Sequence, residues 1–280
     1  MYIINKILSR IINSKFPKIL KYLDTLCFSF CDDNPFKSLK ESDIALLDKK
    51  YNIAKASVSD NLKNFCYLKS PKIPHKFIHK LAYITQTSKK NSDLNYDHGY
   101  LLYAYVYDLA LRKKPLYIIE TGTARGFSSI IMSKAIDDAN SYGTIITFDI
   151  LPHNKKMFWN SPSDIIGTNS RNNLLKDYSS LTDKIIFQQA NTRINIERTH
   201  LNRIHFAFLD GAHEMNDILK EGKFVSDRQK KGDLIIFDDF NELLFPGVVK
   251  GVKKLCNELK YKCDIAGGKN NRSYAICKKL

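Results

Sequence analysis

The stretch LYIIETGTARG, residues 116–126, decides the fold. It begins as a short apolar run typical of a buried β-strand, and this run ends at Glu120. Gly122 then permits a sharp turn and a close approach of a ligand to the backbone, and Gly126 allows tight packing where a helix begins. A strand that passes through a glycine-containing turn into a helix is typical of the first unit of a parallel α/β sheet.

The same alternation continues outward from this stretch. A helix is predicted at 97–113, and apolar runs that indicate strands then alternate with helical patterns. Strands are predicted at 116–120, 144–149, 184–188, 204–210 and 233–238, and helices between or after them at 126–139, 169–179, 213–229 and 247–260. Two last runs, 263–266 and 273–277, are joined by a turn-rich segment and indicate an antiparallel hairpin. We therefore predict a doubly wound, Rossmann-like α/β fold with a seven-stranded, mostly parallel sheet and a C-terminal antiparallel hairpin.

Residues 1–95 differ from this pattern and are predicted to form a mainly helical N-terminal extension to a domain at 96–280. Prolines divide much of the extension into short segments. Its first part, residues 1–16, places isoleucines and leucines on one helical face, with Lys6 and Arg10 off that face. Such a helix could contact a membrane surface peripherally, pack on its own domain, or pack on a second subunit in a homo-oligomer. The sequence leaves these alternatives open.

The composition limits the class of protein. The 280 residues include 44 basic and 29 acidic side chains, a net charge of +15, and residues 1–95 carry more than half of this surplus. A basic surplus can attract nucleic acid or anionic membranes. Coding bias explains it at least as well, since Lys, Asn, Ile and Tyr all have AT-rich codons and all are abundant. Neither a secretory signal nor an apolar run of membrane-spanning length is visible, so we expect a cytoplasmic protein. The six cysteines form no CxxC pair, which favours free thiols in a reducing compartment.

Carboxylates stand at the ends of four of the five predicted parallel strands. They are Glu120, Asp149, Asp210 and the pair Asp238-Asp239. Because ligands of open α/β sheets bind beyond the carboxyl ends of the strands, these side chains predict a site. The turn after Glu120 has the spacing GxxxG and lacks the GxGxxG of dinucleotide-binding turns, which disfavours a nicotinamide-dependent oxidoreductase. An acid at this place suits a cationic ligand better than a phosphate.

A second set of polar residues follows the fourth and fifth predicted strands. The fourth strand leads into Asp210-Gly-Ala-His213, and the fifth leads into Asp238-Asp239. Two carboxylates at about 4 Å repel each other by about 4 kcal/mol at an effective dielectric constant near 20. Three converging acids therefore need a cation or a shared proton. Oxygen ligands favour a hard divalent ion such as Mg²⁺.

These residues carry a resemblance to a known family. Glu120, Gly122 and Gly126 match the acid-x-Gly-x-x-x-Gly motif, so the chain resembles the class I S-adenosylmethionine-dependent methyltransferases. The resemblance implies that Asp149 binds the ribose hydroxyls of the methyl donor and that Asn191 contacts its adenine. The implied cofactor-binding set is Glu120, Gly122, Thr123, Gly126, Asp149, Asn191 and Asp210.

The DGAH and FDDF elements look like those of a subgroup of small-molecule O-methyltransferases. Some sugar-modifying relatives in this group bind Mg²⁺ through acids at these positions and use a nearby His as a base. Carried over, Asp210, Asp238 and Asp239 become metal ligands, while His213, with Asp210, becomes catalytic. The resemblance covers roughly residues 97–280 and implies methylation of a small-molecule or saccharide hydroxyl.

Two other functions were weighed against this interpretation. An RNA or DNA methyltransferase could use the basic N-terminal region. Nucleic acid is nevertheless a less favoured partner, because Asp-Gly-Ala-His stands where base-amine methyltransferases have an Asn/Asp-Pro-Pro-aromatic element. The other alternative is a non-catalytic binder of the methyl donor.

In the long loop 151–167, Trp159 could either stack on a ligand or pack beneath the loop.

Overall fold

The computed structural model describes residues 36, 38–56, 62, 66–67, 69–70, 72–90, 93–268 and 272–280. Apart from residue 36, these residues belong to one unit, Ser38–Leu280. The predicted amphipathic segment 1–16 lies outside the described residues, as do Cys27 and Cys31. Among the helices of the described part, none is long and apolar enough to cross a membrane.

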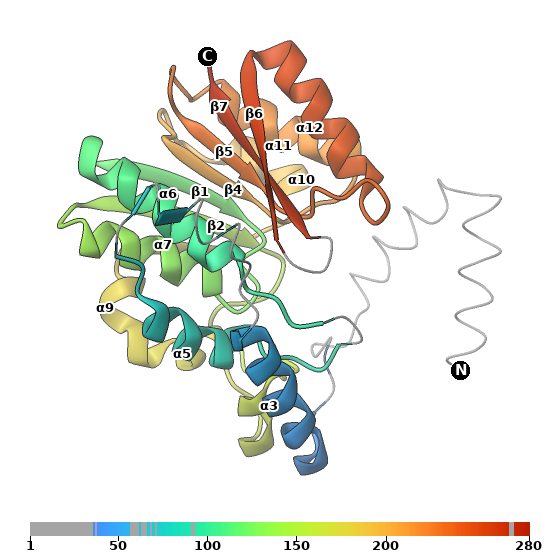
Figure 1. Cartoon of the computed structure of the whole chain (residues 1–280). Helices are drawn as coiled ribbons and strands as arrows, with labels where there is room; N and C mark the ends of the chain where they lie inside the picture. The colour runs from blue at the N-terminus through green and yellow to red at the C-terminus, as the bar shows by residue number, and fades with distance from the viewer. Residues whose placement is uncertain are drawn as a thin grey trace. The chain divides into compact units, whose positions relative to one another are not determined.

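A seven-stranded sheet forms the centre of the fold (Figure 1). Its order is β3-β2-β1-β4-β5-β7-β6, so β1 and β4 are neighbours at the point where the strand order reverses. The first five strands in this order are parallel, and β7 runs antiparallel to both β5 and β6. The strands are β1 (Leu116–Thr121), β2 (Gly143–Asp149), β3 (Ile185–Gln189), β4 (Phe206–Leu209), β5 (Leu234–Phe237), β6 (Tyr261–Gly267) and β7 (Ser273–Lys279). The predicted Rossmann-like sheet and its C-terminal hairpin are confirmed.

Helices cover both faces of the sheet (Figure 1). On one face lie α6 (His98–Arg112) and α7 (Phe127–Asp138), which pack on each other; on the other lie α11 (Met215–Ser226) and α12 (Pro246–Leu259). Alternate residues of β1 pack on the two faces of the sheet. Ile118 belongs to the hydrophobic core beneath α6 and α7, and Ile119 belongs to the core beneath α11 and α12. Burial on both faces explains why these strands read as continuous apolar runs.

The described N-terminal part is helical, as predicted. It contains α3 (Glu41–Ala56) and α5 (His75–Thr85). Helix α5 packs on α7, and its buried Ile78 and Leu81 join the same core as α6. The boundary between residues 95 and 96 remains a prediction.

One predicted helix, 169–179, is divided into short turns. Helix α8 (Arg171–Leu174) ends where Leu175 leaves the helical conformation, and η2 (Lys176–Tyr178) and α9 (Ser179–Thr182) follow. Leu175 packs closely against Gly126, where α7 begins. Burial of this side chain therefore bends the chain where sequence periodicity alone suggested a continuous helix. The other short helices are η1 (Pro162–Ile166), α10 (Thr192–Asn195) and η3 (Ile196–Arg198).

Candidate active site

The loop after β1 presses against the end of β4. Gly122 has a φ of +88°, and a Cβ at this position would lie 2.4 Å from the carbonyl oxygen of Asp210. Only glycine fits both the left-handed backbone and this close approach. The loop is fixed from its other side by Asp149, whose Oδ2 accepts a hydrogen bond of 2.6 Å from the backbone N–H of Ala124. Gly122 thus allows the β1–α7 loop to lie against the end of β4, at the point where the strand order reverses.

A cavity of about 600 Å³ opens at this place. Its size is typical of a small-molecule site, and polar and apolar atoms contribute almost equally to its lining. The lining comes from the β1–α7 loop, the ends of β4 and β5, the segment before β7 and the N-terminal part of the described chain. The lining residues are Gln86, Lys90, Asp93, Asn95, His98, Gly122, Thr123, Ala124, Arg125, Ser128, Asp210, Asp239, Asn241, Leu244, Phe245 and Arg272.

Asp210, His213 and Asp239 form the Asp–His cluster: Asp210 and Asp239 line the cavity, and His213 lies beside Asp239 but is not among the residues that line it. One ligand atom from each lies within 4.8 Å of the others. His213 Nε2 lies 3.0 Å from Asp239 Oδ2, and its ring stacks on Phe245 at a centroid distance of 4.6 Å. The loop that carries His213 is held close to α12, because a Cβ at Gly247 would lie 2.3 Å from the His213 carbonyl oxygen.

Charge is concentrated in the Asp–His cluster. Burial, together with the nearby carboxylates of Asp238 and Asp239, raises the pKa of Asp210 well above its ordinary value. The hydrogen bond that His213 donates to Asp239 raises the pKa of His213, although partial burial of the ring opposes this change. The cluster can therefore hold a proton or a cation.

Asp238 lies beside the cluster but has a different partner. Its two carboxylate oxygens accept hydrogen bonds from Arg272, with the Nε–Oδ1 distance at 3.0 Å and Nη2 bonded to Oδ2. Burial alone would raise the pKa of Asp238, but the charge and hydrogen bonds of Arg272 hold it below its ordinary value. The structure thus places His213, rather than Asp238, in the group of converging donors.

Glu120 is fully buried behind the loop and does not line the cavity. Its Oε2 accepts a hydrogen bond from Ser129 Oγ, whereas Oε1 has no hydrogen-bond partner among the described residues. Burial raises the pKa of Glu120, and hydrogen bonds from Ser128, Ser129 and Thr147 oppose the rise. The carboxyl group therefore anchors the start of α7 to the end of β1.

Two further residues predicted to bind the cofactor lie outside the cavity lining. Asp149 accepts hydrogen bonds from the backbone N–H groups of Ala124 and Leu151, at 2.6 and 2.7 Å. Asn191 caps α10, since its side chain accepts a hydrogen bond of 3.0 Å from the Arg193 N–H. Thr123 and Gly122, in contrast, do line the cavity, and Gly126 begins α7 at the end of the same loop.

His98 and Lys90 line the cavity, although the sequence pattern did not indicate them. The His98 ring stacks parallel to Phe208 and edge-on to Phe127, and burial lowers its pKa to about 3. Its Nδ1 has no hydrogen-bond partner in the described part of the chain. Burial and the neighbouring guanidinium groups of Arg272 and Arg125 lower the pKa of Lys90. In the sequence, His98 is visible only as a histidine at the start of the predicted helix 97–113, which does not indicate a cavity.

Trp159 packs beneath its loop. It is fully buried, and its Nε1 donates a hydrogen bond of 2.7 Å to the Asn169 carbonyl oxygen. Of the two alternatives left open by the sequence, the structure selects packing. The indole ring cannot stack on a ligand in this conformation.

Comparisons with known proteins agree with this geometry. Residues 119–240 match a family model described as a methyltransferase domain. No curated protein gives a significant sequence match. The matched segment runs from the end of β1 to the residues that follow β5 and so includes the Asp–His cluster.

Solved structures with the same fold include several methyltransferases. The O-methyltransferase NovP has a TM-score of 0.54 at 12% identity, with 84% of this chain and 99% of NovP covered. A candidate O-methyltransferase from Klebsiella pneumoniae has a TM-score of 0.53 at 14% identity, over 78% and 94% of the two chains. Cofactor-bound Rv0187 from MTB has a TM-score of 0.53 at 10% identity, over 77% and 94%. At these identities the likeness concerns the fold. Together with the domain match over residues 119–240, this fold supports an S-adenosylmethionine-dependent methyltransferase.

Proposed function

We propose that the chain transfers the methyl group of S-adenosylmethionine to a hydroxyl oxygen of a small molecule, with a saccharide as the preferred acceptor class. The observation that carries the proposal is that the glycine loop, Gly122–Arg125, lines the same cavity as Asp210 and Asp239 of the Asp–His cluster. A methyl donor and its acceptor must meet in one water-poor space, with the reacting atoms about 3–3.5 Å apart. The cavity lies at the switch point of the sheet, where the ligands of open α/β sheets bind.

The donor end of the cavity is assigned to the glycine loop. Gly122 and Thr123 would face the amino-acid part of the donor, and Asp210 and Asp239 offer negative charge to the cationic sulfonium. Glu120, Gly126 and Asp149 support this loop, and Asn191 stays assigned to the adenine. When bound, the cofactor supplies an activated methyl group and a thioether leaving group. The chain's own residues then have to orient the acceptor oxygen and remove its proton.

His213 is assigned as the general base. With Nε2–H donating to Asp239 Oδ2, the neutral ring keeps its free electron pair on Nδ1. The acceptor oxygen forms a bond to the methyl carbon while the carbon–sulfur bond breaks toward sulfur, and the hydroxyl proton passes to Nδ1. Asp239 stabilises the imidazolium that results. General-base catalysis of this kind contributes about 10²- to 10⁴-fold to a rate.

A hard divalent cation such as Mg²⁺ is proposed as an additional component. The carboxylates of Asp210 and Asp239 suit such an ion, whereas Asp238, proposed as a ligand from the sequence, is neutralised by Arg272. Asp210 and Asp239 would hold the ion, and His213 would stay the base, because its one free electron pair cannot both bind the ion and accept the proton. The ion would lower the pKa of the acceptor hydroxyl. In an enzyme that needs no ion, His213 carries the proton transfer alone.

The acceptor class rests on the cavity lining and on the sequence motifs. Gln86, Lys90 and Asn95 supply hydrogen-bonding groups that suit an acceptor with several hydroxyls. The DGAH and FDDF elements are similar to those of sugar-modifying O-methyltransferases, and NovP is an O-methyltransferase of the same fold. Nucleic acid is not favoured as an acceptor.

Three measurements test the proposal. Calorimetric titration should give binding of S-adenosylmethionine and S-adenosylhomocysteine, and none of NAD. A panel of saccharides and phenols should then yield S-adenosylhomocysteine with at least one acceptor, and an RNA panel should yield none. Donor binding without turnover on any hydroxyl compound would overturn the acceptor assignment. Loss of turnover in EDTA, restored by Mg²⁺, supports the cation, and unchanged turnover removes it.

A further inference from the structure

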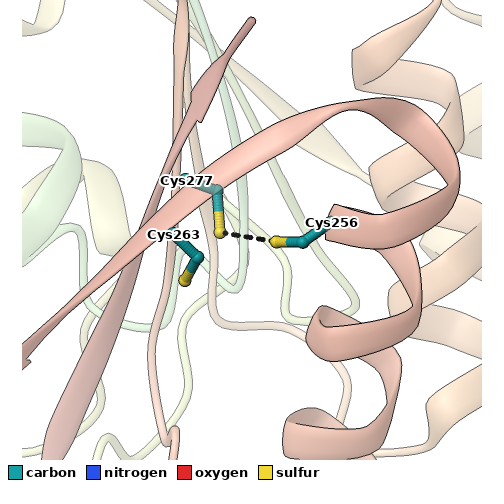
Figure 2. Close-up of side chains that lie close together, drawn as sticks. All are labelled: Cys256, Cys263 and Cys277. Atoms are coloured by element: carbon teal, nitrogen blue, oxygen red, sulfur yellow. Dashed lines mark hydrogen bonds between the residues drawn. The ribbon is translucent and has the colours of Figure 1, made fainter.

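A second group of metal-binding side chains lies outside the cavity. Cys256 on α12, Cys263 on β6 and Cys277 on β7 form the cysteine cluster (Figure 2). The three sulfur atoms lie within 4.8 Å of one another, and those of Cys256 and Cys277 are 3.6 Å apart. Cys277 pairs with Ile235 of β5, four residues before Asp239 of the Asp–His cluster. At about 3.3 Å per residue, the two clusters are about 13 Å apart along the strand.

The fold brings these cysteines together from three elements. Cys263 and Cys277 are directly opposed in the antiparallel hairpin, so their side chains share one face of the sheet. Helix α12 covers this face, and its Leu255 and Val252 belong to the same core as Cys277. Cys256 follows Leu255 and completes the group. Packing of the hairpin against α12 therefore holds the thiols in place before any ligand binds.

The spacing of the sulfur atoms fits a bound metal ion. Two thiolates on a tetrahedral ion with Zn–S bonds of about 2.3 Å are about 3.8 Å apart. The 3.6 Å between Cys256 and Cys277 is close to this value. Thiolates select soft or borderline ions such as Zn²⁺ and disfavour Mg²⁺. Cys256 and Cys263 are only partly buried, so an ion can enter from solvent and keep one position for an exogenous ligand.

We propose that the cysteine cluster binds one thiophilic metal ion of the Zn²⁺ type through three thiolates. All three thiols lose their protons on binding, and no oxidation or reduction takes place. The ion links α12 to the hairpin at the edge of the sheet. The proposal does not depend on the acceptor or on the chemistry of the cavity.

Cobalt titration of the full-length, reduced and metal-free protein tests the proposal. One Co²⁺ per chain should produce thiolate-to-metal charge-transfer absorption in the near ultraviolet, and Zn²⁺ should abolish it by displacement. Co²⁺ held by Asp210, His213 and Asp239 would lack this absorption because no sulfur is present there. The readout therefore separates the two clusters, and it is independent of methyl transfer.

Matched variants locate the binding. Cys256→Ala, Cys263→Ala and Cys277→Ala should each weaken Co²⁺ and Zn²⁺ binding at least tenfold, while Cys66→Ala, which removes a buried cysteine outside the cluster, should leave it unchanged. Should a variant fail to fold, alkylation of the wild-type protein provides the test: one equivalent of Zn²⁺ should slow modification of Cys263 at least tenfold. Absence of the charge-transfer band and of this protection would overturn the proposal. A Cys256–Cys277 disulfide formed in the same reducing buffer would also overturn it.

Discussion

The Asp–His cluster and the cysteine cluster are alike in number and spacing but opposite in chemistry. Each brings three metal-binding side chains within 4.8 Å of one another, and β5 lies close to both. The first offers oxygen and imidazole donors beside a cavity, as catalysis at a sheet rim requires. The second offers only sulfur, on the face of a hairpin packed against a helix. The Asp–His cluster lies at the strand ends, where a catalytic site is expected. The cysteine cluster lies away from the strand ends, and its proposed role is to link α12 to the hairpin.

The largest effect is expected at His213. His213→Ala removes the proposed base and should lower kcat about 10²- to 10⁴-fold with little change in donor binding. Thiolate-dependent Co²⁺ binding should stay unchanged in this variant. Steady-state kinetics, together with calorimetry for the donor, checks the result. A kcat within threefold of the wild type would remove His213 from the mechanism.

Arg272 keeps Asp238 out of the Asp–His cluster. Arg272→Met leaves the buried carboxylate of Asp238 unpaired, so the free energy of unfolding should fall by about 3–5 kcal/mol. Arg112→Met breaks an exposed pair with Asp108 and should cost less than about 1 kcal/mol. Urea denaturation of both variants checks the difference. Equal losses would show that the buried pair is no more important than the exposed one.

Gly122 fixes the distance between the glycine loop and the Asp–His cluster. Gly122→Ala places a Cβ against the Asp210 carbonyl oxygen and should lower kcat/KM by about 10²-fold. Gly232→Ala is the matched control, because Gly232 has the same φ of +88° and no atom within 4 Å of the added Cβ. That variant should stay within twofold of the wild type. Similar activity in the two variants would mean that the contact with Asp210 is unimportant.

Asp239 sets the acid limit of activity. Its hydrogen bond raises the pKa of His213 above 6.5, and the proposed base must be neutral, so activity is lost as pH falls through this raised pKa. Asp239→Asn lowers the pKa of His213 and should move the acid limb of the kcat profile to lower pH. A pH–rate profile from 5 to 9 checks the direction. A shift toward higher pH would contradict the assignment.

The smallest effect is expected from the cysteine cluster on catalysis. Cys256→Ala, Cys263→Ala and Cys277→Ala should each keep kcat/KM within about twofold, because the cluster lies about 13 Å along the strand from the Asp–His cluster. Turnover of the best acceptor from the panel measures this. A tenfold loss of kcat/KM in a folded variant would show that the cysteine cluster affects catalysis at the Asp–His cluster.

The position of the Asp–His cluster could be predicted from the sequence, but only some of its metal-binding side chains could. Asp210 and Asp239 stand at strand ends, where the parallel sheet brings them together, so local patterns sufficed. Asp238 is instead paired with Arg272, which lies 34 residues later in the chain. No local pattern predicts that pair. His98 and Lys90 likewise reach the cavity through tertiary packing of the N-terminal part.

The sheet was predictable because each strand is a separate apolar run. The cysteine cluster was not predicted, since spacings of seven and fourteen residues match no metal motif. Cys263 and Cys277 both lie in the two predicted strands of the hairpin. Pairing these strands would have brought the two cysteines close together. Helix 169–179 was misread because burial of Leu175 against Gly126 depends on α7.

A crystal structure of the full chain with S-adenosylhomocysteine tests the central claim most directly. The account predicts the homocysteine part against Gly122 and Thr123, with the sulfur atom directed toward Asp210 and Asp239. Density for the ligand at another place, or an unchanged cavity at saturating ligand, would contradict it.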